Sequence, residues 1–138
     1  MSKQRTLGLI KPDALERGKQ GAIIDRILSK GFKIVAMKQL RLTKAQAEAF
    51  YAEHAARPFF PSLTGYMVSG PIIALALEKD NAIADWRTLM GATNPEKADA
   101  GTIRKDFAVD LEKNSVHGSD SETSAAREVP FFFNALEA

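Results

Sequence analysis

The chain contains no cysteine among its 138 residues, which excludes disulfides, thiolate metal ligands and a thiol nucleophile. Long apolar runs are missing as well. The longest, residues 72–77, falls far short of the roughly 20 residues that cross a bilayer. The apolar stretch at residues 7–10 is too short for the core of a signal peptide. From these absences we expect a cytoplasmic protein that makes no contact with a membrane.

Neither sign of charge dominates the chain. It has 19 Lys and Arg against 17 Asp and Glu, which gives a net charge of +2 and a sequence pI near 8.9. This mild positive charge suits an anionic small ligand, and it would also suit weak contact with nucleic acid. Apolar residues make up 45% and charged residues 26%, as in ordinary globular proteins. We expect a single domain over residues 1–138, because this length is typical of one domain with its own core.

Hydrophobic spacing predicts four strands and several helices. The strands are expected at residues 6–11, 32–42, 71–78 and 115–118. The third is almost entirely apolar and should be buried on both faces. Helices are expected at residues 12–17, around 23–28, at 43–56, 62–68 and 80–91, and from 119 onward. This order predicts an α+β fold in which the helices pack on one face of a small sheet.

Three of the predicted helices begin with capping signals. Thr43 with Gln46 and Ser119 with Glu122 match the capping box, in which each side chain bonds the backbone of the other residue. Asp80 is expected to cap the helix that follows it. Residues 91–114 show no strong period apart from one helical turn at 102–107. A loop of this length inside a compact domain is usually functional.

Residues 114–121 read N-S-V-H-G-S-D-S and combine features that suit phosphate chemistry. His117 ends a predicted strand just before a helix start, where free N–H groups and the helix dipole favour a phosphate. Gly118 leaves space beside the ring, and histidine is one of the side chains that accept a covalent group. From the position alone, a structural histidine satisfied by hydrogen bonds is equally expected. His54, the other histidine, is expected to be a solvated surface residue.

This segment resembles the signature of the nucleoside diphosphate kinase family, in which the histidine is the phosphorylated nucleophile. Other segments agree with the family in the same order along the chain, at residues 11–13, 57–60, 63–71, 91–95 and 101–104. The resemblance extends from residue 5 to about residue 133. It implies a ferredoxin-like α+β sandwich, with a four-stranded antiparallel sheet and helices packed on it.

The resemblance implies transfer of the γ-phosphate from a nucleoside triphosphate to a nucleoside diphosphate. The reaction would follow a ping-pong order through a phosphohistidine at His117, with donor and acceptor using one cleft in turn. Mg²⁺ would arrive on the nucleotide phosphates, and no side chain is expected to ligate a metal. The family also implies a homo-oligomer, either a tetramer or a hexamer, and no required nucleic acid.

Five residues are placed around the phosphates and the ribose by the resemblance. Lys11, Arg87 and Arg104 would stabilise the charge that develops in the transition state. The planar guanidinium of arginine can hold two phosphate oxygens at once. The Thr93 hydroxyl would bond a phosphate, and Asn114 would bond the ribose 3′-hydroxyl, as the family positions do. Outside these motif contexts, a lone lysine or arginine is usually a surface cation.

The base is expected to stack on Phe59. Stacking uses the π-face that every base has, so it predicts broad nucleotide specificity. Leu63 and Leu111 are further candidates for apolar contact with the base. Without the family resemblance, Phe59 would be interpreted as a core aromatic that follows a proline.

Three further residues match those that support the histidine in the family: Tyr51, Ser119 and Glu128. Glu128 would accept a hydrogen bond from one ring nitrogen of His117, which leaves the other nitrogen free to attack. Tyr51 and Ser119 would help to orient the site. Ser115, by contrast, is expected to be a variable position.

Two other functions remain alternatives at this point. The chain could be a nucleic-acid-binding module, although it lacks the aromatic-rich strand signature of an RNA-recognition sheet. It could also be a nucleotide sensor that binds without turnover, although the intact segment around His117 argues against this. The sequence contains no P-loop and no protein-kinase signature set.

Overall fold

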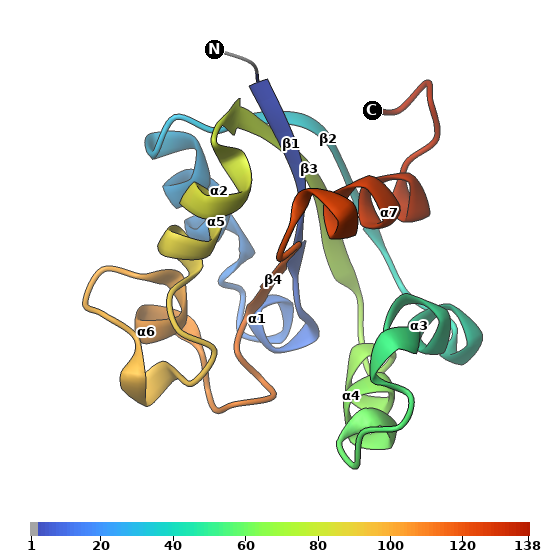
Figure 1. Cartoon of the computed structure of the whole chain (residues 1–138). Helices are drawn as coiled ribbons and strands as arrows, with labels where there is room; N and C mark the ends of the chain where they lie inside the picture. Colours follow the sequence, from blue (N-terminus) through green and yellow to red (C-terminus); the bar gives the residue numbers. More distant parts are fainter. Residues whose placement is uncertain (1–2) are drawn as a thin grey trace.

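A four-stranded antiparallel sheet forms the centre of the protein (Figure 1). The structure is a computed structural model that describes residues 3–138. Along the sheet the strands follow the order β2-β3-β1-β4. They are β1 (Lys3–Ile10), β2 (Lys33–Leu40), β3 (Ile72–Asp80) and β4 (Val116–Gly118). The predicted α+β fold with a four-stranded antiparallel sheet is thereby confirmed. The single domain expected over residues 1–138 stays a prediction, and residues 1–2 lie outside the described part.

Helices cover both faces of the sheet (Figure 1). On one face lie α2 (Gln20–Ser29) and α5 (Ala82–Met90). On the other lie α3 (Lys44–Phe50), α4 (Phe60–Met67) and α7 (Glu122–Phe132). The expectation that helices pack on one face alone was therefore wrong. Successive residues of a strand point to opposite faces, and in the central strands both sets are apolar, so both need cover.

The central strands β1 and β3 show this alternation directly. Ile73 and Leu75 belong to the core beneath α2 and α5, whereas Ile72 and Ala74 belong to the core beneath α3, α4 and α7. The two strands pair along their whole length, from Lys3 opposite Asp80 to Ile10 opposite Ile73. Such strands appear in the sequence as continuous apolar runs, as predicted for residues 71–78.

Four shorter elements complete the fold. They are the helices α1 (Pro12–Glu16) and α6 (Ile103–Phe107) and the 3₁₀ turns η1 (Ala52–His54) and η2 (Pro95–Lys97). The first helical turn and the turn at 102–107 lie close to their predicted positions. Within residues 3–138 no helix has both the length and the apolar character needed to cross a membrane.

Only one of the three predicted helix caps is correct. Thr43 and Gln46 form the expected capping box. Helix α5 is capped at Asn81, in a left-handed conformation with φ 58°, because Asp80 still belongs to β3. Helix α7 is capped at Ser121, whose side chain accepts a hydrogen bond from the Ser124 N–H.

The close contact at Gly118 predicts a measurable effect on stability. A Cβ atom at position 118 would lie 2.5 Å from the Trp86 ring and 2.7 Å from Met90. We expect Gly118→Ala to lower the free energy of unfolding by about 1–3 kcal/mol, the usual cost of overpacking a core. Denaturant unfolding curves measure this change.

Gly65→Ala is the matched control for this substitution. Gly65 lies within α4, and a Cβ there would have no neighbour within 4 Å. Alanine is favoured over glycine inside a helix by about 0.5–1 kcal/mol, so this variant should be as stable as the parent or more stable. Equal stability of the two variants would contradict the proposed clash.

Candidate active site

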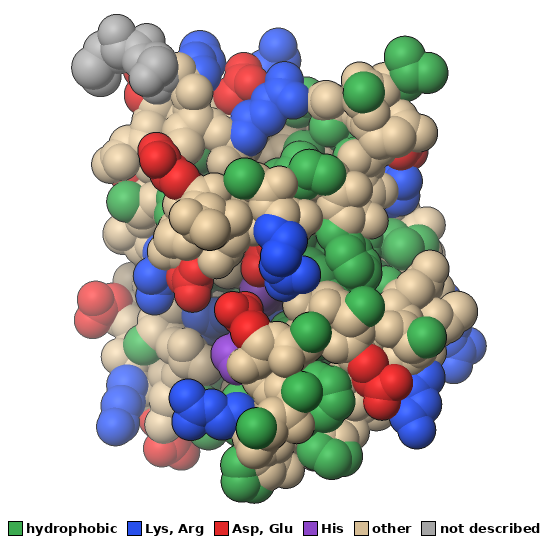
Figure 2. Space-filling view, turned by 45° about the vertical axis from the view of Figure 1, so that its right-hand side comes forward, with side chains coloured by type: hydrophobic (Ala, Val, Ile, Leu, Met, Phe, Trp, Pro, Cys, Tyr) green, Lys and Arg blue, Asp and Glu red, His purple; other side chains and the backbone are tan. Residues whose placement is uncertain are grey.

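A cleft of about 430 Å³ opens between the α3–α4 region and the residues that lead into β4. In the space-filling view, histidine side chains lie near the middle of one face with acidic and basic side chains around them (Figure 2). Of the residues predicted for the site, nine line this cleft: Lys11, Tyr51, Phe59, Leu63, Thr93, Leu111, Asn114, His117 and Glu128. The structure therefore brings together residues that are distributed over most of the chain.

The β1–β4 ladder positions His117. His117 lies in the short strand β4, where it pairs with Leu9 of β1. On the opposite side, the Trp86 indole N–H donates a hydrogen bond of 3.2 Å to the His117 carbonyl. The indole can approach the backbone this closely because the neighbouring Gly118 has no side chain. The backbone of the candidate nucleophile is thus held from two sides.

The imidazole of His117 is oriented by a buried carboxylate. Its Nε2 lies 3.0 Å from Oε1 of Glu128, a residue of α7 that is only 3% exposed. A carboxylate only accepts hydrogen bonds, so Nε2 carries the hydrogen and Nδ1 keeps its lone pair. The Ser119 hydroxyl donates to the same Oε1 at 2.8 Å. The predicted supporting roles of Glu128 and Ser119 agree with these contacts, and Ser119 does not cap α7.

Two aromatic rings pack around the imidazole. The ring centroids of Phe50 and Tyr51 lie 5.3 Å and 6.1 Å from that of His117. Within the described residues, the Tyr51 hydroxyl has no hydrogen-bond partner. Burial raises the pKa of Tyr51 far above its usual value, and the charge of Glu128 adds to the effect. Tyr51 therefore offers a neutral hydroxyl donor in the cleft.

Lys11 and Asn114 form a buried pair at the floor of the cleft. The Lys11 ammonium donates to Asn114 Oδ1 at 2.9 Å, and the Asn114 amide donates to the Leu111 carbonyl. Burial lowers the pKa of Lys11 to about 8, and the positive charge of Arg104 contributes. Asp13 and Glu112 act in the opposite direction. The ammonium is therefore short of compensating negative charge.

An adjoining hollow of about 430 Å³ holds the two predicted arginines. Arg87 and Arg104 line it, and Thr93 lines both this hollow and the cleft. Arg104 is held by the carbonyls of Gly91 at 3.0 Å and Val116 at 2.9 Å. Burial lowers its pKa to about 10, with a further contribution from Arg87. Both hollows together form a site lined by several cationic side chains.

The mouth of the cleft is apolar and exposed. Phe59 immediately precedes α4 and is 47% exposed, and Leu111 is 61% exposed. Leu63, one turn into α4, is buried beneath them and lines the same cleft. The ring of His54 lies 5.7 Å from that of Phe59, and its side chain is 39% exposed, so His54 is a solvated residue at the mouth of the cleft.

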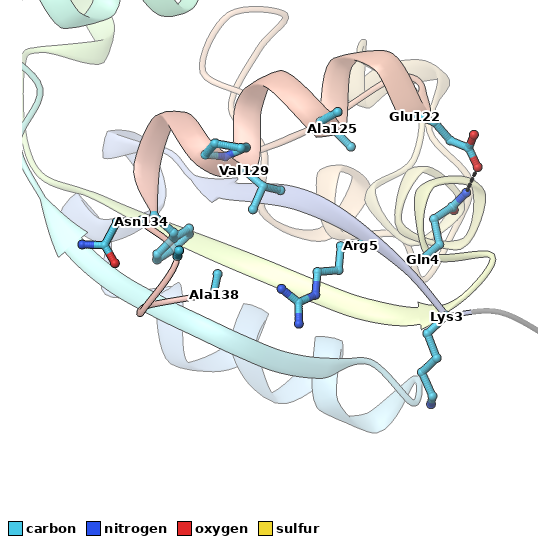
Figure 3. Close-up of a pocket in the computed structure, with 12 residues that line it drawn as sticks. Lys3, Gln4, Arg5, Glu122, Ala125, Val129, Asn134 and Ala138 are labelled. Atoms are coloured by element: carbon cyan, nitrogen blue, oxygen red, sulfur yellow. Dashed lines mark hydrogen bonds between the residues drawn. The ribbon is translucent and has the colours of Figure 1, made fainter.

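A larger hollow, of about 580 Å³, lies away from these residues. It runs between α7, the start of β1 and the last residues of the chain (Figure 3). Its walls are formed mainly by small and apolar side chains of α7 such as Ala125 and Val129, with Arg5 on the strand side. None of the residues predicted for the site lines it. The chemistry is therefore concentrated in the smaller cleft.

Sequence reasoning missed four residues that hold this site in place: Asp13, Tyr66, Trp86 and Ser115. Trp86 contacts the His117 backbone, as described above. Of the other three, Tyr66 and Ser115 both donate hydrogen bonds to Asp13, two residues after Lys11 in the chain. The one available signal in the sequence was the acidic Asp13 directly after Pro12. A carboxylate that is buried at such a position needs hydrogen-bond donors around it. The expectation that Ser115 varies freely does not fit its complete burial and its two hydrogen bonds to Asp13.

Comparison with known proteins gives a consistent result at the level of families. Residues 4–138 match the family model described as nucleoside diphosphate kinase. The nucleoside diphosphate kinase of Geotalea daltonii is 61% identical over 134 residues, which cover 97% of this chain and 98% of the relative. That of Pasteurella multocida is 59% identical over 133 residues, or 96% of each chain.

Solved structures of this family also share the fold. The nucleoside diphosphate kinase of Aquifex aeolicus superimposes with a TM-score of 0.96 at 43% identity and covers 99% of both chains. A halophilic nucleoside diphosphate kinase from Halobacterium salinarum, solved in complex with CDP, superimposes with a TM-score of 0.95 at 40% identity. That match covers 99% of this chain and 91% of the relative.

The buried position of Lys11 predicts an unusual titration. We expect its ammonium to lose the proton near pH 8 rather than near 10.5. The unfolded chain keeps this proton up to about pH 10.5, so the contribution of Lys11 to the free energy of unfolding should rise between these pH values. NMR of the lysine side chains against pH measures the titration, with Lys11→Met identifying the signal. A midpoint near 10.5 would contradict it.

Proposed function

The chain belongs to the nucleoside diphosphate kinase family, and from this premise we propose that His117 is the residue that carries the phosphoryl group. The activity is transfer of the γ-phosphate of a nucleoside triphosphate to a nucleoside diphosphate, in the ping-pong order that is standard for the family. The proposal rests on the 3.0 Å contact between His117 Nε2 and Glu128, which leaves Nδ1 as the free nitrogen of a ring that lines the cleft.

The transfer consists of two displacements at phosphorus. First, Nδ1 of His117 attacks the γ-phosphorus while the bond to the β-phosphate oxygen breaks, and the diphosphate leaves with that electron pair. The imidazole gains positive charge, which Glu128 stabilises through the hydrogen on Nε2. Next, a β-phosphate oxygen of an incoming diphosphate attacks the phosphorus. The N–P bond breaks, and its electron pair returns to Nδ1.

Positive charge in the site supports the binding of the nucleotide phosphates there. Lys11 and Arg104 are largely removed from water, so their attraction to phosphate oxygens is screened less than it would be at the surface. Arg87 and the hydroxyl of Thr93 extend the phosphate site into the adjoining hollow. Asn114, beside Lys11, is within reach of the ribose hydroxyl in this arrangement.

The exposed aromatic at the cleft mouth supports base binding there. The base stacks on Phe59, with Leu111 and Leu63 as apolar neighbours. Stacking of this kind tolerates all bases. The relative from Halobacterium salinarum was solved with CDP, and we propose that nucleotides of this class enter the equivalent cleft. Tyr51 packs edge-on against the ring of His117, and Ser119 bonds the Glu128 oxygen that holds Nε2 of this ring.

Magnesium is proposed to arrive on the nucleotide phosphates. Within residues 3–138 there is no group of three or more His, Asp or Glu side chains arranged to hold a metal ion. Instead, the buried Lys11 and Arg104 and the exposed Arg87 line the site. Cationic side chains bind phosphate oxygens and not Mg²⁺, so the proposed metal would be held by the phosphates of the nucleotide. Such an ion would neutralise phosphate charge.

Replacing the histidine tests the carrier role. In His117→Ala we expect phosphoryl transfer to fall by at least about 10⁴-fold, as happens when other covalent nucleophiles are removed. Brief incubation of the parent protein with γ-labelled ATP should give an acid-labile, base-stable label on His117, and NMR should identify Nδ1 as the substituted nitrogen.

His54→Ala is the matched control, because His54 is the other histidine of the chain and also lines the cleft. This variant should still acquire the label at position 117. Transfer at the parental rate by a clean preparation of His117→Ala would overturn the proposal. Nucleotide binding without any label would favour the sensor alternative.

A homo-oligomer, tetramer or hexamer, is proposed as the assembled form. Strand β2 is an edge of the described sheet, and an unpaired edge can bond another chain. Met37, on this strand, is 52% exposed. Independence from nucleic acid and a cytoplasmic location stay predictions from the sequence.

The edge of β2 gives the oligomer a direct test. Met37→Lys places a charge among the residues that would be buried between copies, so we expect sedimentation to show a smaller assembly than the parent forms. Val109→Lys is the control, since Val109 is similarly exposed, at 55%, in the segment before β4. A parent protein that sediments as a monomer would contradict the proposal.

A further inference from the structure

Asp13 is a buried carboxylate that does not line the cleft. It is 4% exposed and accepts hydrogen bonds at both oxygens. Oδ1 accepts from the Tyr66 hydroxyl and from the Ser115 N–H at 3.2 Å. Oδ2 accepts from the Ser115 hydroxyl at 3.0 Å and from Arg17 at 3.1 Å. In addition, the Asp13 N–H donates to the Tyr66 hydroxyl at 3.0 Å.

These partners belong to three segments that carry residues of the candidate site. Lys11 lies just before Asp13, and its N–H donates to the Ser115 carbonyl at 2.8 Å. Asn114 is the neighbour of Ser115 in the chain. Tyr66 lies on α4, the helix that presents Leu63 to the cleft. One carboxylate therefore ties together the segments on which the floor and one wall of the cleft depend.

The backbone at Ser115 needs this support. The backbone of Ser115 has φ 71°, a left-handed conformation that residues other than glycine rarely adopt. The Val116 N–H donates to the Asn114 carbonyl at 2.9 Å, so Asn114, Ser115 and Val116 close a three-residue turn of a strained type. Both polar groups of Ser115 that could stabilise the turn, its N–H and its hydroxyl, bond Asp13.

We propose that Asp13 is a positioning residue for phosphoryl transfer, which holds the turn at Ser115 and thereby keeps Asn114 against Lys11. The proposal rests on the proposed function, because Lys11 and Asn114 are assigned there to the nucleotide. Asp13 itself touches no substrate. It acts on the pair whose ammonium and amide oxygen are 2.9 Å apart.

A role in stability alone does not account for a carboxylate at this point. Burying a charge is costly, and well-packed apolar residues often stabilise a protein as well as a buried ion pair does. The nearest cation, Arg17, reaches Asp13 from a partly exposed position. An oxygen-rich group is needed, however, to receive four donors from three separate segments. Misplacement by about 1 Å at a distance from the chemistry can lower rates about 100-fold.

Asp13→Asn tests the inference with little change in shape. We expect kcat/KM to fall by about 10- to 100-fold, while the thermal midpoint stays well above the assay temperature. The alkaline limb of the pH–rate profile should also move to lower pH. Asp13 is one of the two negative charges, with Glu112, that offset the effects of burial and Arg104 on the Lys11 pKa. A merely structural role would not shift that limb.

Glu78→Gln is the matched control. Glu78 lies at the opposite end of β3 and pairs with Arg5 at 2.9 Å, so the control also removes one carboxylate charge from an ion pair. It should keep the parental kcat/KM and pH profile. Ser115→Ala removes only the hydroxyl that donates to Asp13, and it should lower kcat/KM in the same direction without moving the alkaline limb.

If Asp13→Asn does not fold, Ser115→Ala and Tyr66→Phe carry the test, and parental kcat/KM in both would overturn the inference. In a folded Asp13→Asn protein, either parental kinetics or a loss of rate with an unmoved alkaline limb would overturn it. Labelling with γ-labelled ATP separates this from the proposed function. Absence of label at His117 in the parent contradicts the carrier role, whereas slower labelling of the same residue in Asp13→Asn supports the positioning role.

Discussion

The hydrogen bond between His117 and Glu128 is the contact on which the rest of the site depends. A carboxylate buried to this degree needs donors, and Glu128 finds them in the imidazole and in Ser119. Both donors lie in or just after β4, and Glu128 comes from α7, so the strand and the last helix must keep a fixed spacing. The sheet provides this spacing, because β1 contacts both β4 and α7.

Burial also shapes the electrostatics of the cationic side chains in the site. Lys11 and Arg104 are buried although neither has a carboxylate as a direct partner. Instead, Asn114 and backbone carbonyls accept hydrogen bonds from them with partial charges only, and Arg104 Nε has no partner within the described residues. Such a site is left with excess positive potential. The phosphate groups proposed to bind here would supply the missing negative charge and would thereby offset the cost of burying the two cations.

Much of the fold could be predicted from the sequence, because apolar spacing and turn residues act locally. The strand at residues 71–78 and the capping box at Thr43 are examples. The cap at Ser121 was missed because neighbouring serines offer several equivalent starts. For the site, the family resemblance supplied residues such as Lys11 and Asn114. It could not tell which of the two ring nitrogens is free, nor the contacts of Asp13. These depend on contacts between residues as far as 102 positions apart, which no local pattern encodes.

The indole behind the candidate nucleophile has an optical consequence. Trp86 is the only tryptophan of the chain, and its N–H is bonded to the peptide carbonyl of the residue proposed to be modified. The emission of a buried indole is sensitive to the polarity and charge around it. A doubly charged group added to the adjacent ring would therefore alter the intrinsic fluorescence of the protein, so the unlabelled chain carries its own spectroscopic probe of each half-reaction.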